Sequence, residues 1–163
     1  MKGYTVYRRI VRAIGGATLL SATLGWIHNA EAQVTKQSDL SFGTILTGRT
    51  STVSITSGNA AEWKAHEGLS LSTSLTFTLP NALTRTGGGG SIPISFCSTC
   101  AAYHTNVNNP SGGTTFNPAT GANITISIAS DIYVWLGASV NPPLNQPAGT
   151  YSATVVLTVN SLL

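Results

Sequence analysis

Hydrophobic and polar residues alternate along most of the chain beyond residue 38. In the clearest case, residues 69–79, leucine or phenylalanine occupies nearly every second position and serine or threonine lies between. A period of two places alternate side chains on opposite faces of a β-strand. Shorter runs of the same kind occur at residues 40–46, 53–55, 92–96, 124–128, 132–136 and 151–159. The pattern therefore predicts about seven strands.

Turn signals separate these runs and favour an all-β fold. Clusters of glycine, asparagine and proline punctuate the chain, for example at residues 87–90, 108–113 and 141–143. Only residues 60–68, which carry several charges, could form a short helix or helical turn. Because strands do not alternate with helices, we expect a single antiparallel β-sandwich over residues 33–163.

Residues 1–32 differ from the rest of the chain. A basic start is followed by an apolar run of 15 residues, 13–27, and then by Ala30-Glu31-Ala32. This is the three-part pattern of a secretory signal peptide, and the run is shorter than the roughly 20 residues that span a bilayer. We expect cleavage between Ala32 and Gln33, and localisation in the periplasm, at the cell surface or outside the cell.

The signal peptide also accounts for the basic character of the chain. The whole chain has a net charge of +3, and residues 1–32 contain four basic residues and one acid. The remaining charged residues sum to zero: Lys36, Arg49, Lys64 and Arg85 against Asp39, Glu62, Glu67 and Asp131. Without a basic patch we expect no nucleic-acid partner, and no further apolar run is long enough for a membrane span.

Cys97 and Cys100 are the only cysteines. In an exported protein a disulfide is expected. Three extended residues would separate the two Cα atoms by roughly 10 Å, whereas a disulfide requires about 4.4–6.8 Å, so the chain must turn at Ser98-Thr99. A redox pair, or a metal site that includes His104, is less favoured because neither the helical context nor a fourth ligand is evident.

No arrangement of residues predicts catalysis. His66 and His104 are the only histidines beyond the signal peptide, and no G-x-S-x-G sequence is present. We therefore expect no enzyme activity, no cofactor and no resident metal. Four aromatic residues, Trp63, Tyr103, Tyr133 and Trp135, are candidates for a partner surface. Core packing is the simpler interpretation, because both faces of the strand at residues 132–136 are apolar.

Two segments resemble a known group of domains. Asp39-Leu40-Ser41-Phe42-Gly43-Thr44-Ile45 is similar to the L-x-F-G opening of secreted bacterial pilin-like domains of unknown function, and residues 149–159, GTYSATVVLTV, are similar to their ending. These domains are related to spore-coat U proteins and to subunits of archaic chaperone–usher pili. The resemblance implies an immunoglobulin-like sandwich, surface placement, fibre assembly and a periplasmic chaperone as partner.

The segment before the first expected strand departs from that group. Fibre subunits carry an N-terminal extension with several alternating apolar residues that completes a neighbour's sheet. Residues 33–38 offer only Val34, so a donor role would fall to the strand expected at residues 40–46.

Together these features predict an exported, non-catalytic structural or assembly protein that self-associates through a strand edge or joins related surface subunits. The alternative is a secreted adhesin-like module that recognises a glycan or a protein through exposed aromatic residues.

Overall fold

The computed structural model describes residues 33–68, 72–126 and 129–162; the expected signal peptide lies outside this part. The described residues form an all-β structure with one short 3₁₀ helix, η1 (Pro110–Gly112). The strands are β1 (Gln33–Ser38), β2 (Ser51–Val53), β3 (Ala61–Glu67), β4 (Ser72–Thr78), β5 (Ala82–Arg85), β6 (Ser91–Ser95), β7 (Ala101–Thr105), β8 (Thr114–Phe116), β9 (Ala122–Thr125), β10 (Ser130–Leu136), β11 (Ala138–Val140), β12 (Tyr151–Ser152) and β13 (Val156–Leu162). No helix among the described residues has the length and hydrophobicity of a membrane span.

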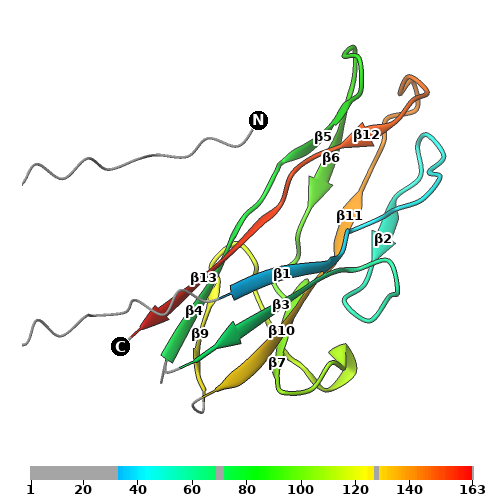
Figure 1. Ribbon diagram of the computed structural model, residues 1–163. Helices are drawn as coiled ribbons and strands as arrows, with labels where there is room; N and C mark the ends of the chain where they lie inside the picture. The colour runs from blue at the N-terminus through cyan, green and yellow to red at the C-terminus, as the bar shows by residue number, and fades with distance from the viewer. Residues whose placement is uncertain (1–32, 69–71, 127–128, 163) are drawn as a thin grey trace, which may run out of the picture.

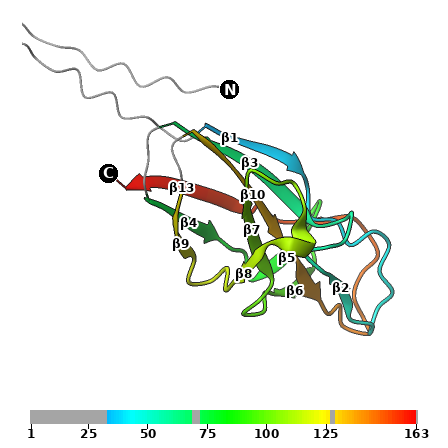
Figure 2. The same ribbon diagram turned by 90° about the horizontal axis from the view of Figure 1, so that it is seen from below.

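The strands form an antiparallel β-sandwich, as the sequence predicts (Figures 1 and 2). One sheet has the order β1-β3-β10-β7-β8, a second β12-β5-β6-β11-β2 and a third β13-β4-β9. The second and third sheets share two long ribbons in Figure 1, because β4 leads into β5 and β12 leads into β13. The ladder between the ribbons is broken between the Ser152–Thr84 and Val156–Thr78 pairs.

Two hydrophobic clusters fill the space between the layers. The larger cluster joins the first and third sheets and includes Leu75, Ile132 and Leu136, all fully buried. The smaller cluster lies on the second sheet around Ile92 and Val140. Leu40 and Phe96 pack against both clusters, so the apolar core continues from one end of the sandwich to the other.

The helical turn considered for residues 60–68 is wrong, since these residues form β3. Alternate side chains of β3 are buried (Ala61, Trp63, Ala65, Glu67), and Lys64 and His66 lie on the other face. β3 pairs with β1 on one side and with β10 on the other. Pairing along both edges and burial of one face override the weak helical preference of alanine, glutamate and lysine.

The strand expected at residues 40–46 is also absent. Residues 39–50 are irregular, and Gly43 has a positive φ of 63°. Leu40, Phe42 and Ile45 nevertheless pack on the core. Their hydrophobicity therefore reflects burial of a loop, while the first strand is β1, formed by the polar residues before it.

The other predicted strands are present with different bounds: the run at 132–136 lies within β10, and the run at 53–55 overlaps β2 only at Val53. The run at 69–79 contains β4, with residues 69–71 outside the described part, and the run at 124–128 contributes to β9, with residues 127–128 outside it. The last run is divided between β12 and β13. Pro93 would favour an edge strand, yet β6 lies between β5 and β11. The ladder with β11 ends at Ile94, next to the proline that has no N–H.

Several strands were not predicted, among them β5, β7, β8 and β11. They are short, three to five residues each, and carry little alternation. This explains why thirteen strands are found in the described residues where about seven were expected.

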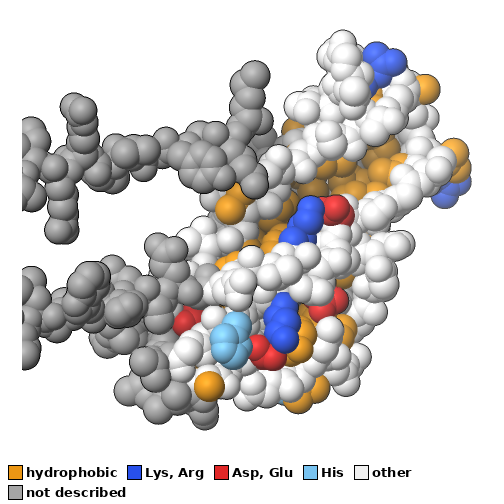
Figure 3. Space-filling view, in the orientation of Figure 1, with side chains coloured by type: hydrophobic (Ala, Val, Ile, Leu, Met, Phe, Trp, Pro, Cys, Tyr) orange, Lys and Arg blue, Asp and Glu red, His pale blue; other side chains and the backbone are white. Residues whose placement is uncertain are grey.

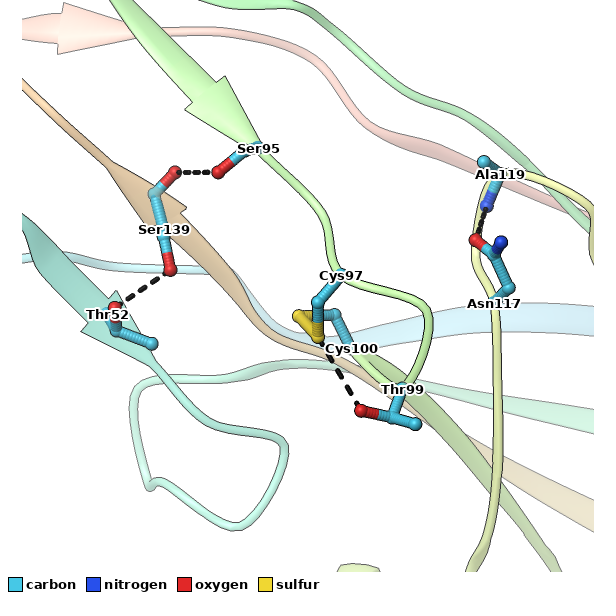
Figure 4. Close-up of a disulfide and its surroundings, with 8 residues drawn as sticks. All are labelled: Thr52, Ser95, Cys97, Thr99, Cys100, Asn117, Ala119 and Ser139. Carbon is cyan, nitrogen blue, oxygen red and sulfur yellow. Dashed lines mark hydrogen bonds between the residues drawn. A yellow bond between two sulfur atoms is a disulfide. The ribbon is translucent and has the colours of Figure 1, made fainter.

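The disulfide between Cys97 and Cys100 is present, and the turn at Ser98-Thr99 is as predicted (Figure 4). The Cα atoms are 4.9 Å apart, and the Cys100 N–H donates to the Cys97 carbonyl at 3.1 Å. The bridge thus closes the turn that links β6 to β7. With both sulfur atoms in the disulfide, the metal site considered with His104 has no thiolate ligand.

Gly137 marks the point where the chain passes from the first sheet to the second. β10 ends at Leu136 and β11 begins at Ala138. A Cβ at position 137 would lie 2.3 Å from the Val53 carbonyl oxygen. Only glycine permits this approach of two backbones.

Candidate functional site

An apolar groove opens between the two layers of the sandwich. It encloses about 930 Å³ and is bordered by residues 39–47 on one side and 146–155 on the other. Hydrophobic side chains gather in a hollow on the face shown in Figure 3. The groove floor consists of Ala61, Trp63, Leu83, Ile92 and Ile94. The groove therefore reaches side chains that belong to the core.

The strands that border the groove have unpaired edges. β1, which contributes Lys36 to the lining, and β12, which contributes Tyr151 and Ser152, each lie at the end of a sheet. Residues 153–155, between β12 and β13, lie outside both ladders that join the two ribbons. Such an edge offers N–H and C=O groups to an added strand.

β13 contacts β3 away from the residues that line the groove. There the Ser161 hydroxyl donates to Glu67 Oε2 at 2.6 Å and links β13 to β3. Glu67 is 1% exposed, and its Oε1 has no hydrogen-bond partner in the described structure. This polar link joins β13 of the third sheet to β3 of the first sheet.

A polar cluster lies on the outer face of the first sheet. It consists of Gln33 and Thr35 on β1, Lys64 and His66 on β3, and Asp131 on β10, around a hollow of about 290 Å³. Lys64 Nζ lies 2.8 Å from Asp131 Oδ2, and His66 Nδ1 lies 2.8 Å from Asp131 Oδ1. Both carboxylate oxygens of Asp131 are therefore engaged.

The charges in the polar cluster stabilise each other. The hydrogen bond from Lys64, followed by that from His66, lowers the pKa of Asp131 below its ordinary value. The same bond to Asp131 raises the pKa of Lys64. Asp131 thus stays ionised, and Lys64 protonated, across the neutral pH range.

The four candidate aromatic residues lie on two opposite faces of the first sheet. Trp63 and Tyr103 point inward: Trp63 is 6% exposed, its ring lies 5.5 Å from that of Phe77, and Tyr103 lies 6.1 Å from Phe116. Tyr133 and Trp135 lie on the outer face and stack at 6.3 Å. The four residues do not form one surface.

Of the outer pair, only Tyr133 is partly exposed. Lys64 Nζ lies 5.5 Å from the centre of its ring. Trp135 is 3% exposed; it pairs with Glu62 of β3, which accepts a hydrogen bond from Asn108 at 2.8 Å. The loop after β7 therefore crosses β10 at Trp135 and reaches Glu62 on β3.

Sequence reasoning did not find the groove or the polar cluster. The groove combines residues from segments far apart in the chain, and its floor cannot be distinguished from ordinary core positions in a sequence. His66 and Asp131 were noted only separately, because the pairing of β3 with β10 brings them together. Among the described residues, no three histidine, cysteine or acidic side chains gather as a metal site would require.

The fold and the groove define an antiparallel β-sandwich with an open apolar cleft between its edge strands. Residues 32–161 match the family described as Domain of unknown function (DUF4402), and the chain belongs to this family. No curated protein and no solved structure matches the chain.

Proposed function

We propose that the protein is an exported, non-catalytic structural protein of the cell surface whose subunits self-associate by strand addition at the apolar groove. The observation that carries the proposal is the groove itself, an apolar cleft of about 930 Å³ bordered by unpaired strand edges. An extended segment of a second copy would place alternate apolar side chains on the groove floor and hydrogen-bond to the edge.

The chemistry of the groove rims supports an apolar, extended partner. Leu46 is 71% exposed on one rim, although it is a large hydrophobic residue. The opposite rim includes residues 153–155, which lie outside the ladders on either side of them. Beyond the expected signal peptide the charges sum to zero, so subunits gain little electrostatic protection against association.

The proposed location outside the cytoplasm is supported by sequence features. Residues 1–32 have the three-part pattern of a secretory signal. The disulfide between Cys97 and Cys100 suits an oxidising compartment. The similarity of residues 39–45 and 149–159 to pilin-like domains related to spore-coat U proteins and archaic chaperone–usher subunits supports fibre assembly, with a periplasmic chaperone as a further partner.

The test is a substitution on the groove rim. Leu46→Asp removes an exposed hydrophobic side chain and places a charge where an apolar strand would dock. We expect the dissociation constant for self-association to rise by about tenfold or more, since this corresponds to about 1.4 kcal/mol. Sedimentation equilibrium of the secreted protein over a range of concentrations measures the change.

Val107→Asp is the matched control. Val107 is 46% exposed, outside the groove, and undergoes the same change of chemistry. It should leave the dissociation constant unchanged. A secreted protein that stays monomeric at millimolar concentration, or equal effects of the two substitutions, would contradict the proposal.

We favour assembly over the adhesin-like alternative. An aromatic recognition surface would need several exposed rings, but Trp63 and Trp135 are buried and Tyr103 packs against the core. Tyr133 remains as the partly exposed member of the four.

A further inference from the structure

The His66–Asp131 pair in the polar cluster has the geometry of an oriented proton acceptor. His66 and Asp131 are cross-strand partners, and the 2.8 Å contact joins His66 Nδ1 to the carboxylate. In the neutral imidazole the proton therefore lies on Nδ1, and Nε2 keeps its lone pair. The His66 side chain is 57% exposed, so Nε2 can accept a proton from a group at the surface.

Gln33 lies beside this histidine. It is the first residue of β1, and its register partner on β3 is His66. Side chains of directly opposed residues have Cβ atoms about 4.5–5.5 Å apart. Both side chains line the same hollow of about 290 Å³.

The expected signal cleavage makes Gln33 the first residue of the exported chain. We propose that Gln33 is a modification site at which the new N-terminus cyclises to pyroglutamate, with His66 transferring the proton. This inference rests on the export step of the proposed function, and it assigns a role to a cluster that strand addition at the groove does not use.

The reaction is intramolecular and balances without a co-reactant. The α-amino nitrogen of Gln33 attacks Cδ of its own side-chain amide, so that an N–Cδ bond forms and the bond from Cδ to the amide nitrogen breaks. His66 Nε2 accepts the proton that the attacking amine loses and returns it to the leaving nitrogen, which departs as ammonia. Asp131 is a positioning residue, because it holds the Nδ1 proton and so keeps Nε2 free to accept.

Cyclisation would change the start of β1 in a defined way. The α-amino group, which carries a positive charge in part of the molecules at neutral pH, becomes a neutral lactam. The charged groups that face this position are Lys64 and Asp131, which remain paired with each other. The edge strand thus begins with an uncharged, blocked terminus.

The experiment follows the N-terminus of the full chain after export. Intact-mass and peptide mass spectrometry measure the fraction of chains that begin at Gln33 and have lost one ammonia, as a function of time after harvest. The hexapeptide with the sequence of β1, Gln-Val-Thr-Lys-Gln-Ser, gives the rate without the fold. We expect the folded protein to cyclise about a hundredfold or more faster than the peptide, which is the low end for general acid–base catalysis.

Two substitutions separate proton transfer from a general effect of the fold. His66→Ala should reduce the rate to that of the peptide, and Asp131→Asn should reduce it in part. His104→Ala is the matched control, since His104 lies on β7, across β10 from β3, and should leave the rate unchanged. Circular dichroism checks that all three variants keep the β-structure.

The outcomes distinguish the inference from the proposed function. Chains that begin at Gln33 with a free amine, or a His66→Ala variant that cyclises as fast as the parent, overturn the inference alone. Secreted chains that still carry residues 1–32 overturn both the inference and the export step.

Discussion

At the scale of single residues, the contact at Gly137 shows how one missing side chain allows a strand to change sheets. An added Cβ would lie 2.3 Å from the Val53 carbonyl oxygen and 3.1 Å from the Ile55 backbone nitrogen. Neither neighbour is a side chain that could rotate away. We expect Gly137→Ala to lower the free energy of unfolding by about 2 kcal/mol or more, as overpacking does, measured by denaturant titration. Gly58→Ala is the control, because a Cβ there meets nothing within 4 Å; equal losses at both positions would contradict this account.

At the scale of elements, the disulfide turn between β6 and β7 acts as a local clip. The bridge joins two cysteines that are three residues apart in sequence. Nearby, the Thr52 and Ser139 hydroxyls hydrogen-bond between β2 and β11, and the Ser95 hydroxyl of β6 donates to the Ser139 carbonyl (Figure 4). Replacement of both cysteines by serine should lower the free energy of unfolding by about 2 kcal/mol, since a short loop gains little from closure. Thermal unfolding and circular dichroism measure the change. A double variant that does not fold would show that the bridge supports more than this turn.

At the scale of the whole molecule, the balance of charge and the apolar groove together determine how association responds to salt. The four basic and four acidic residues beyond residue 32 cancel, so screening has little net repulsion or attraction to remove. The dissociation constant should change less than about threefold between 0.05 and 0.5 M sodium chloride, and ammonium sulfate should lower it, because sulfate strengthens apolar burial. Light scattering measures the dissociation constant in both salts, and the Leu46→Asp variant is the control. Dissociation on addition of sodium chloride would show that ion pairs, and not the groove, hold the copies together.

The pattern of apolar residues predicted the central strands β4 and β10 well. β10 was expected to be interior because both of its faces are apolar, and it lies between β3 and β7. β4 and the disulfide turn were also predicted. The local sequence was sufficient in these cases, because a strand buried on one face alternates between apolar and polar residues and a strand buried on both faces is continuously apolar.

The prediction failed where distant contacts decide the local structure. β3 contains residues with helical preference, and only its pairing with β1 and β10 makes it a strand. Residues 40–46 alternate like a strand but form a loop in which Leu40, Phe42 and Ile45 are partly buried against the core. Hydrophobic alternation indicates which side chains are buried. Whether the backbone forms a strand depends on the distant segments with which it can pair.

The sequence alone determined the all-β class, the antiparallel sandwich and the disulfide, because these follow from local alternation, turn residues and the spacing of two cysteines. The tertiary structure decided which strands share a sheet, and with it both candidate sites. The groove is lined by residues of β1 and β12, which each end a sheet, and by the loops next to them. The polar cluster exists because strand pairing aligns Gln33, His66 and Asp131. Register between strands depends on contacts over long sequence separations, which a pattern of neighbouring residues does not encode.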